Sequence, residues 1–210
     1  MVYTDSAFRQ GLPGGFRTTG LAAILAAVSV PLGAITITEI QYDPPGSAAG
    51  LELIEIHNDS PTVADVSGWA FTEGIDFTFG KGTFIPGRGY VVLCADETAF
   101  RNAYPGVTPL GVFGGRLDSN GETLVLSNNG GGEVLRIRFR ARGKWPSLPA
   151  GTGHTLALRR PHLDPGEPES WTASAQPGGT PGTANFPTGG SNDTELIAAG
   201  AGWSYKKGTE

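Results

Sequence analysis

The sequence predicts an all-β fold with one short helix. Glycine (33 of 210 residues) and proline (16) interrupt short hydrophobic runs along the chain, which is typical of strands joined by many turns. Several of these runs alternate apolar and polar residues, the period-two pattern of a half-buried strand. A domain of about 150 residues can bury roughly two-thirds of its unfolded surface, so it needs no disulfide or metal for stability.

The first part of the predicted domain contains four short strands. Ile35–Ile40 alternates and is rich in β-branched residues. Leu53–Ile56 predicts a second strand, which ends at Asn58–Pro61 because these polar residues bond to their own backbone and proline fixes φ. Val63–Trp69 predicts a third strand, kinked at Gly68, and Ile75–Phe79 predicts a fourth.

The middle of the chain predicts a turn, a buried strand and the helix. Thr83–Cys94 contains a turn at Pro86-Gly87 and then a strongly apolar strand. Helix formation is predicted over 96–104, because Asp96 can cap the N-terminus and Phe100 and Tyr104 fall on one face.

Two hairpins are predicted after the helix. Val112–Leu117 and Glu122–Leu126 flank the tight-turn sequence Asp118–Gly121. Asn128–Gly132 is a second turn signal, followed by a strand over Val134–Phe139.

Short motifs follow one another in a recognisable order over residues 35–185. They are Glu52-x-x-Glu55-Ile56-x-Asn58, Asp65-Val66-Ser67-Gly68-Trp69, Trp145-Pro146, Gly151-Thr152-Gly153-His154, Trp171-x-x-Ser174 and Gly179-Thr180-Pro181-Gly182-x-x-Asn185. Together they resemble the lamin-tail domain family in its bacterial secreted form. The resemblance implies an immunoglobulin-like β-sandwich in which these motif residues are structural. It implies no reaction, because a fold alone does not specify a function.

The N-terminal region predicts a signal peptide over residues 1–34. Arg9 and Arg17 precede the apolar run Leu21–Ala34, which ends in the small residues Gly33 and Ala34. This order is typical of a secretory leader, so we expect a secreted, extracellular or cell-surface protein. An anchor helix or a buried core helix is the alternative interpretation, although the run is short for a membrane span.

The C-terminal region changes character after Asn185. Residues 186–194 form a Pro/Gly/Ser linker. Residues 195–210 resemble the opening strand of a following module and predict a truncated start of it.

Catalytic chemistry has little support in the sequence. The three histidines are His57, His154 and His162, and no Gly-x-Ser-x-Gly motif occurs. The single cysteine, Cys94, follows an apolar run, which predicts an inert core thiol. His154 is expected to be structural or exposed. Cysteine and histidine do not cluster with zinc-ligand spacing, and no cofactor is expected.

Four acidic residues near the first two strands raise the question of a binding site for a hard metal ion. They are Glu39, Asp43, Glu52 and Glu55, and carboxylate oxygens are ligands that Ca²⁺ takes. Glu52 shares parity with Ile54 and Ile56 and should start on the core side, whereas Glu55 should point the other way. We therefore favour structural hydrogen bonding over metal binding.

Aromatic residues at motif positions have two interpretations. Trp69, Trp145 and Trp171 could form a carbohydrate-stacking platform. Core packing is favoured, because large aromatic side chains dominate core energetics and all three occupy motif positions.

A basic strand departs from the family pattern. Arg136, Arg138, Arg140 and Arg142 alternate with Ile137, Phe139 and Ala141, and Lys144 extends the series. Period two places the cations on one side of the strand, and we call these five residues the basic face. A solvated strand that resists edge-to-edge pairing explains it, with Glu122 or Glu133 as neutralising neighbours. A surface for anionic glycans, lipid head groups or phosphates is the alternative. Nucleic-acid binding is not expected of a chain with net charge −5.

The sequence thus predicts a non-catalytic binding or display module of a secreted or cell-surface bacterial protein. Its partner would be an unknown protein or an anionic glycan or cell-surface polymer. The alternative is an accessory domain of a larger exported enzyme (hydrolase, nuclease or spore-coat-kinase-like) whose catalytic part lies beyond residue 210. A third hypothesis, a self-contained hydrolase, would depend on Glu55 or His154.

Overall fold

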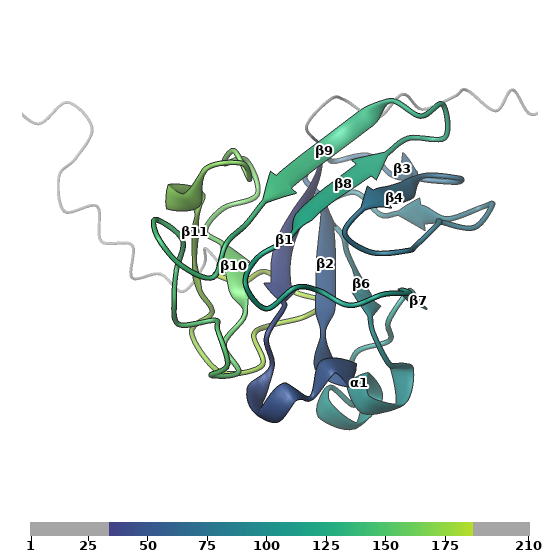
Figure 1. Cartoon of the computed structure of the whole chain (residues 1–210). Helices are drawn as coiled ribbons and strands as arrows, with labels where there is room; N and C mark the ends of the chain where they lie inside the picture. The colour runs from purple at the N-terminus through teal and green to yellow at the C-terminus, as the bar shows by residue number, and fades with distance from the viewer. Residues whose placement is uncertain (1–33, 187–210) are drawn as a thin grey trace, which may run out of the picture.

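The computed structural model describes residues 34–186 as a β-sandwich with one short α-helix (Figure 1). The strands are β1 (Ile35–Gln41), β2 (Leu53–Asn58), β3 (Ala64–Asp65), β4 (Ala70–Glu73), β5 (Phe84–Ile85), β6 (Tyr90–Cys94), β7 (Gly111–Val112), β8 (Thr123–Ser127), β9 (Glu133–Arg138), β10 (Leu156–Leu158) and β11 (Trp171–Ala173). The helix is α1 (Glu97–Ala103), and short 3₁₀ turns occur at Pro45–Ser47, Ala49–Leu51 and Pro168–Ser170. The predicted all-β class is confirmed.

Predictions made for the two ends of the chain fall outside these residues. Apart from Ala34, the predicted signal peptide lies within residues 1–33, and most of the predicted linker and truncated module lie within 187–210.

Two main sheets enclose the core. The larger sheet has the order β11-β10-β1-β2-β6-β7, and the smaller has the order β4-β8-β9. A separate two-stranded sheet joins β3 to β5. Figure 1 shows β8 and β9 crossing in front of β1 and β2. Strand β7 pairs parallel to β6, whereas the other strand pairs within these sheets are antiparallel.

The strands β1 and β2 are buried on both faces, since every residue of each is buried. Their inner side chains include Ile37, Ile40, Ile54 and Ile56, which belong to one apolar cluster with β8 and β9 residues of the opposite sheet. Their outer face carries polar side chains such as Glu39 and Glu55 that are buried all the same. Loops must therefore cover this outer face and satisfy its hydrogen bonds.

A β-bulge in β1 decides which side chains reach that outer face. Ile37 lies opposite Ile56, and the next registered pair is Glu39 opposite Glu55, so Thr38 is the extra residue. The bulge changes the parity of β1, because Ile35 and Ile37 before it and Ile40 and Tyr42 after it all belong to the inner core. Glu39 is thereby placed next to Glu55 on the outer face.

Helix α1 covers a second, smaller core on the outer face of the larger sheet. The Asp96 carboxylate caps it by accepting a hydrogen bond from Ala99 N at 2.8 Å. Phe100 packs with Leu53, Val92 and Cys94. The predicted helix and its cap are confirmed.

The single kinked strand predicted over Val63–Trp69 is wrong. The chain makes a turn at Gly68 (φ +74°), so β3 and β4 enter different sheets. Val63 is 44% exposed rather than part of the core. Ile75–Phe79 is not a strand either, because it makes only isolated bridges through Asp76 and Thr78, although Ile75 and Phe79 are buried.

The first hairpin predicted after the helix is also wrong, whereas the second is confirmed. Residues 111–112 join the larger sheet as β7, while Thr123–Ser127 belongs to the smaller sheet. The intervening chain crosses between the sheets, anchored by Leu117 N, which donates to Glu52 Oε2 at 2.8 Å. In the β8–β9 hairpin, the Asn128 side chain accepts hydrogen bonds from Gly130 N and Gly132 N.

The three motif tryptophans pack inside the sandwich. Trp69, Trp145 and Trp171 are all buried core members. The rings of Trp145 and Trp171 lie 6.2 Å apart between centroids, and Trp171 Nε1 donates to Pro165 O at 2.9 Å. This placement supports packing and leaves no exposed stacking platform among these three side chains.

Truncating Trp69 should destabilise the sandwich. Its side chain is 7% exposed, so Trp69→Ala should lower the free energy of unfolding by about 3–5 kcal/mol through lost burial and the cavity left behind. Urea unfolding followed by circular dichroism measures this change. Val63→Ala, at an exposed position, is the control and should change stability by about 0.5 kcal/mol or less. Equal effects of the two substitutions would contradict the buried role.

Candidate functional site

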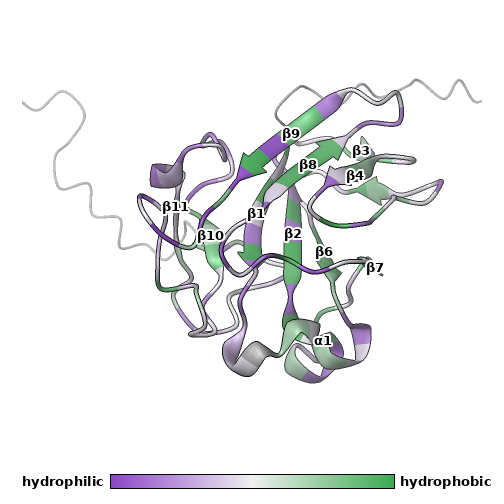
Figure 2. Cartoon of the chain, in the orientation of Figure 1, coloured by the Kyte–Doolittle hydropathy of each residue, from purple (hydrophilic) through white to green (hydrophobic). Residues whose placement is uncertain are grey.

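The basic face is exposed along β9 and beyond its end. Arg136, Arg138, Arg142 and Lys144 are exposed and Arg140 is half-buried. The intervening Ile137, Phe139 and Ala141 are buried, as the alternation predicts. Figure 2 shows this as alternating hydrophilic and hydrophobic colour along β9. The strand is an edge of the smaller sheet, since the order is β4-β8-β9.

Only one cation of the basic face has carboxylate partners within the part of the chain that the structure describes. Arg136 pairs with Glu73 at 3.1 Å and with Glu133 at 2.9 Å, and these contacts raise its pKa. Glu122, the other candidate neighbour, instead accepts a hydrogen bond from Thr123 N. In residues 34–186, Arg138, Arg140, Arg142 and Lys144 therefore remain without an ion pair.

A second arrangement of charged groups lies on the outer face of β1 and β2. Glu39 and Glu55 are directly opposite each other on the two strands, and both are 0% exposed. Glu55 accepts hydrogen bonds from Thr38 Oγ1 and Gly182 N, each at 2.6 Å. Glu39 accepts from Thr180 N at 3.1 Å and from the Thr155 hydroxyl. Both carboxyl groups thus bind the same stretch of chain, residues 178–185, which we call the closing segment.

Further contacts fix the closing segment. Asn185 Nδ2 donates to Thr38 O at 2.6 Å, and Thr180 Oγ1 donates to Asn185 Oδ1 at 3.1 Å. At its other end, the Tyr104 hydroxyl donates to Gly178 O at 2.8 Å. The motif residues Glu55, Thr180, Gly182 and Asn185, far apart in the sequence, therefore meet in one hydrogen-bonded cluster.

Burial raises the pKa of both acids in this cluster. For Glu39, burial raises the pKa to about 7 against the opposing hydrogen bonds from Thr155 and Thr180. For Glu55, burial raises the pKa to about 8; the Thr38 hydrogen bond opposes this, and the neighbouring Glu39 charge adds to it. Desolvation disfavours the charged form, and two adjacent carboxylates disfavour double ionisation.

The four acidic residues considered as metal ligands do not converge. Glu52 faces the core side, as its parity predicts, and lies 3.7 Å from Arg116 Nε. It lines a polar hollow of about 310 Å³ with Asp43, apart from the Glu39–Glu55 pair. In residues 34–186 no group of three or more His, Cys, Asp or Glu side chains is placed to hold a metal ion.

The other motif residues make structural contacts. Asn58 Nδ2 donates to Thr62 O, Ile85 O and Pro86 O, and its Oδ1 accepts from Ser60 N. Asp65 Oδ1 accepts from Ser67 N in the turn before Gly68. This side-chain network ties the end of β2 to the β3–β5 sheet.

Motif residues near β10 hold the loops on the outer face. Gly151 N donates to Asp43 O, Gly153 O accepts from Gly178 N, and Ser174 Oγ accepts from Thr155 N. Pro146 and Pro181 add no hydrogen-bond donor of their own.

The histidines and the cysteine are separated. His57 is buried, stacks on Tyr90 and lies within hydrogen-bond distance of Gly89 O; burial lowers its pKa. His154 Nδ1 lies 2.8 Å from Ser174 O, a structural contact. Burial raises the pKa of the Cys94 thiol to about 11, as suits an inert core thiol. Within residues 34–186, no serine hydroxyl or cysteine thiol is hydrogen-bonded to a histidine ring.

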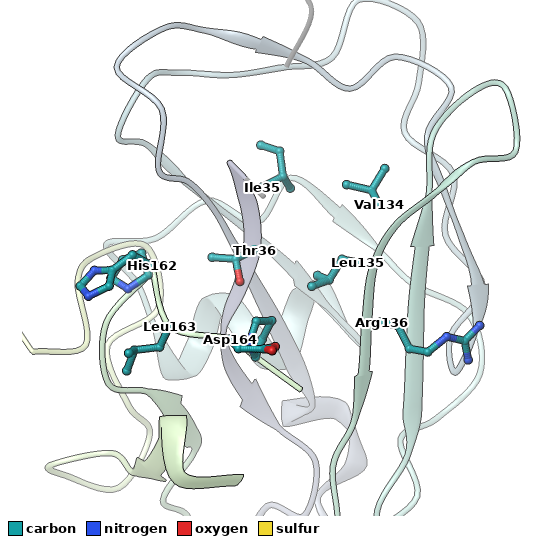
Figure 3. A pocket seen from close by; sticks show the side chains of 10 residues that line it. Ile35, Thr36, Val134, Leu135, Arg136, His162, Leu163 and Asp164 are labelled. Atoms are coloured by element: carbon teal, nitrogen blue, oxygen red, sulfur yellow. The ribbon is translucent and has the colours of Figure 1, made fainter. Parts of the chain in front are cut away.

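A shallow groove of about 400 Å³ opens beside β9. Ile35 and Thr36 of β1, Val134 and Leu135 of β9, and the loop around His162 line it. Figure 3 shows Arg136 pointing away from these side chains. Arg136 nevertheless lines the groove too, so one cation of the basic face borders it beside these apolar and polar side chains.

The Glu39–Glu55 pairing has no signal in the sequence. Simple alternation places Glu39 on the side of Ile35 and Ile37, and only the bulge at Thr38 moves it beside Glu55. Tyr104 was expected only to pack on a helix face, whereas its hydroxyl also holds the closing segment.

A family model described as Lamin Tail Domain matches residues 29–141, more than half of the chain. A search of curated proteins finds no match. The motifs from Trp145 to Asn185 lie beyond the matched residues, yet β10 and β11 belong to the same sheet as β1.

An added methyl group at Gly179 should disrupt the closing segment. Gly179 has φ +68°, and a Cβ there would overlap Glu39 Oε1. Gly179→Ala should lower the free energy of unfolding by about 3 kcal/mol or more, combining backbone strain with displacement of a buried carboxyl. Chemical denaturation measures the loss.

The control is Gly131→Ala, which shares the backbone conformation (φ +80°) but would meet no atom within 4 Å. It should cost only the left-handed backbone strain, about 1–2 kcal/mol. Similar losses for the two variants would show that the close approach to Glu39 is unimportant.

Proposed function

The chain belongs to the lamin tail domain family, and on this premise we propose that it is a binding or display module of a secreted or cell-surface bacterial protein. The family indicates a non-catalytic, immunoglobulin-like module. The separated histidines and the buried thiol support a role without turnover. We further propose that the module binds an anionic glycan or another anionic cell-surface polymer.

The basic face is the observation that carries the binding proposal. Four of its cations lack carboxylate partners in residues 34–186, on a chain whose net charge is −5. Like charges at neighbouring positions of one face repel one another. Ordinary salt largely screens this repulsion only at separations beyond about 8–10 Å. A polyanion lying along the row would relieve this repulsion.

Protection of an edge strand accounts for only part of the row. Charged residues on β9 hinder pairing with another strand, and β9 is an edge strand. However, β9 ends at Arg138, whereas Arg140, Arg142 and Lys144 continue the cationic series beyond the hydrogen-bonding edge. Their presence favours a ligand that extends past the strand.

The leader sequence supports the proposed export. Basic residues followed by an apolar run and small residues are the ordinary order of a secretory signal. Within the described residues, 34–186, no helix has the length and apolar character needed to cross a membrane.

Export should produce a mature chain that begins near Ile35. N-terminal sequencing of the protein from the medium of a secreting bacterial host checks this. Leu25→Arg, which places a charge in the apolar run, should block export. Soluble protein that retains Met1 in the cytosol of the unmodified strain would contradict the proposal.

Replacing Arg138 and Arg140 together by glutamine should weaken binding to heparin or anionic liposomes. We expect about a tenfold loss of affinity, because exposed ion pairs contribute up to about 1 kcal/mol each. Affinity of the unmodified protein should also fall as salt rises, since salt screens exposed charges.

The matched control replaces Arg101 and Arg160, two arginines outside the basic face, by glutamine. It makes the same change in net charge, so it should leave most of the affinity if the face itself binds. Absent or salt-independent retention of the unmodified protein, or equal losses in both double variants, would refute the binding proposal.

A further inference from the structure

The closing segment is attached to the sandwich by two acids that share one buried environment. Thr180 N donates to Glu39, and Gly182 N donates to Glu55. The two acids are cross-strand neighbours with no exposed surface. Two carboxyl groups on paired positions, both shielded from water, cannot both ionise without a large electrostatic cost. The pair therefore favours a state in which at least one carboxyl group keeps its proton.

No cation in the surrounding elements neutralises the pair. Within residues 34–186, neither Glu39 nor Glu55 has an ion-pair partner. Nearby titratable groups are Tyr104 beyond α1, Tyr90 on β6, and His57 on β2, which stacks on Tyr90. Arg159 lines a small hollow with Thr38 and Tyr90, and its Nε donates to Glu169 O. The buried pair is therefore stabilised by the hydrogen bonds it accepts and by the proton it retains, not by a cation.

We propose that Glu39 and Glu55 form a proton-dependent latch, which holds the closing segment on β1 and β2 at low pH and releases it when both carboxyl groups ionise. The latch is independent of the proposed polyanion binding, because it uses contacts on the outer face of the larger sheet. Release would free residues 178–185 from β1 and β2. The connection between the sandwich and Phe186 would then become longer and looser.

The direction of the pH effect follows from the raised pKa values of the closed state. In the open state both carboxyl groups would be solvated and would ionise near the ordinary value of 4.5. The closed state retains protons up to about pH 7 for Glu39 and about pH 8 for Glu55. Closure is therefore fully favoured below pH 4.5 and weakens progressively up to about pH 8.

A measurement between pH 6.5 and 8.5 isolates the pair. Burial lowers the pKa of His57 from 6.5, so this ring changes charge mainly below the window and with the opposite effect on stability. Burial raises the pKa of the Cys94 thiol from 9.0 to about 11, so this group changes charge mainly above the window. Tyr90 and Tyr104 have pKa values raised above 10.0.

Amide hydrogen exchange of the full chain tests the latch. Protection factors of Thr180 and Gly182, corrected for base catalysis of exchange, should fall at least about tenfold between pH 6.5 and 8.5, since each proton lost changes the equilibrium about tenfold per pH unit. Ala99 is the internal control, because its amide also donates to a carboxylate, that of Asp96, but away from the pair. Ala99 should keep its protection. Unchanged protection at Thr180 and Gly182 would overturn the latch.

Glu55→Gln should flatten this pH dependence. An amide at position 55 is neutral at every pH, and its oxygen can still accept from Gly182 N. Glu169→Gln, at an exposed site without a side-chain hydrogen bond in the described residues, should leave the drop unchanged. A drop that persists at full size in Glu55→Gln, or an equal flattening in both variants, would refute the assignment.

A direct titration of the unmodified chain keeps the test decisive if Glu55→Gln does not fold. Carbon-13 NMR of the glutamate carboxyl carbons should show two groups that titrate well above the other glutamates. If all glutamate carboxyl groups titrate between about pH 4 and 5, the latch does not exist.

Discussion

The sandwich depends on the hydrogen bonds of polar side chains buried on the outer face of β1 and β2. A buried polar group without a partner costs about 1–3 kcal/mol, and an unpaired buried charge costs more. Glu39 and Glu55 are tolerated there because Thr38, Thr155, Thr180 and Gly182 donate to them. The closing segment therefore supplies hydrogen-bond donors that the two buried carboxyl groups require.

Because of this requirement, the two faces of the larger sheet are stabilised in different ways. The inner face packs isoleucines against the smaller sheet and gains its stability from apolar burial. The outer face combines a small apolar core under α1 with the carboxyl pair under the closing segment. Residues beyond the matched family region therefore complete a sheet that begins inside it, because β10 pairs with β1.

The sequence allowed prediction wherever local periodicity or turn chemistry decides the structure. Alternation correctly separates the arginines from Ile137 and Phe139, and the Asp96 cap correctly begins the helix. The bulge at Thr38 has no local signal, so the position of Glu39 beside Glu55 could not be predicted. The alternation over Ile75–Phe79 correctly places Ile75 and Phe79 in the core, but the predicted strand is wrong because the backbone there makes only isolated bridges. Tertiary context decides such short segments.

The position of β1 in the sheet also governs the order in which the molecule can assemble. The first strand of the sandwich lies between β2 and β10, and Glu39 meets Thr155 across 116 residues of chain. Long-range pairings of this kind slow folding, because loop-closure entropy is lost before the contacts form. A nascent chain therefore carries β1 with one open edge until its last third has been synthesised. Under the export proposed above, this delay would keep the chain competent for translocation until the closing residues are synthesised.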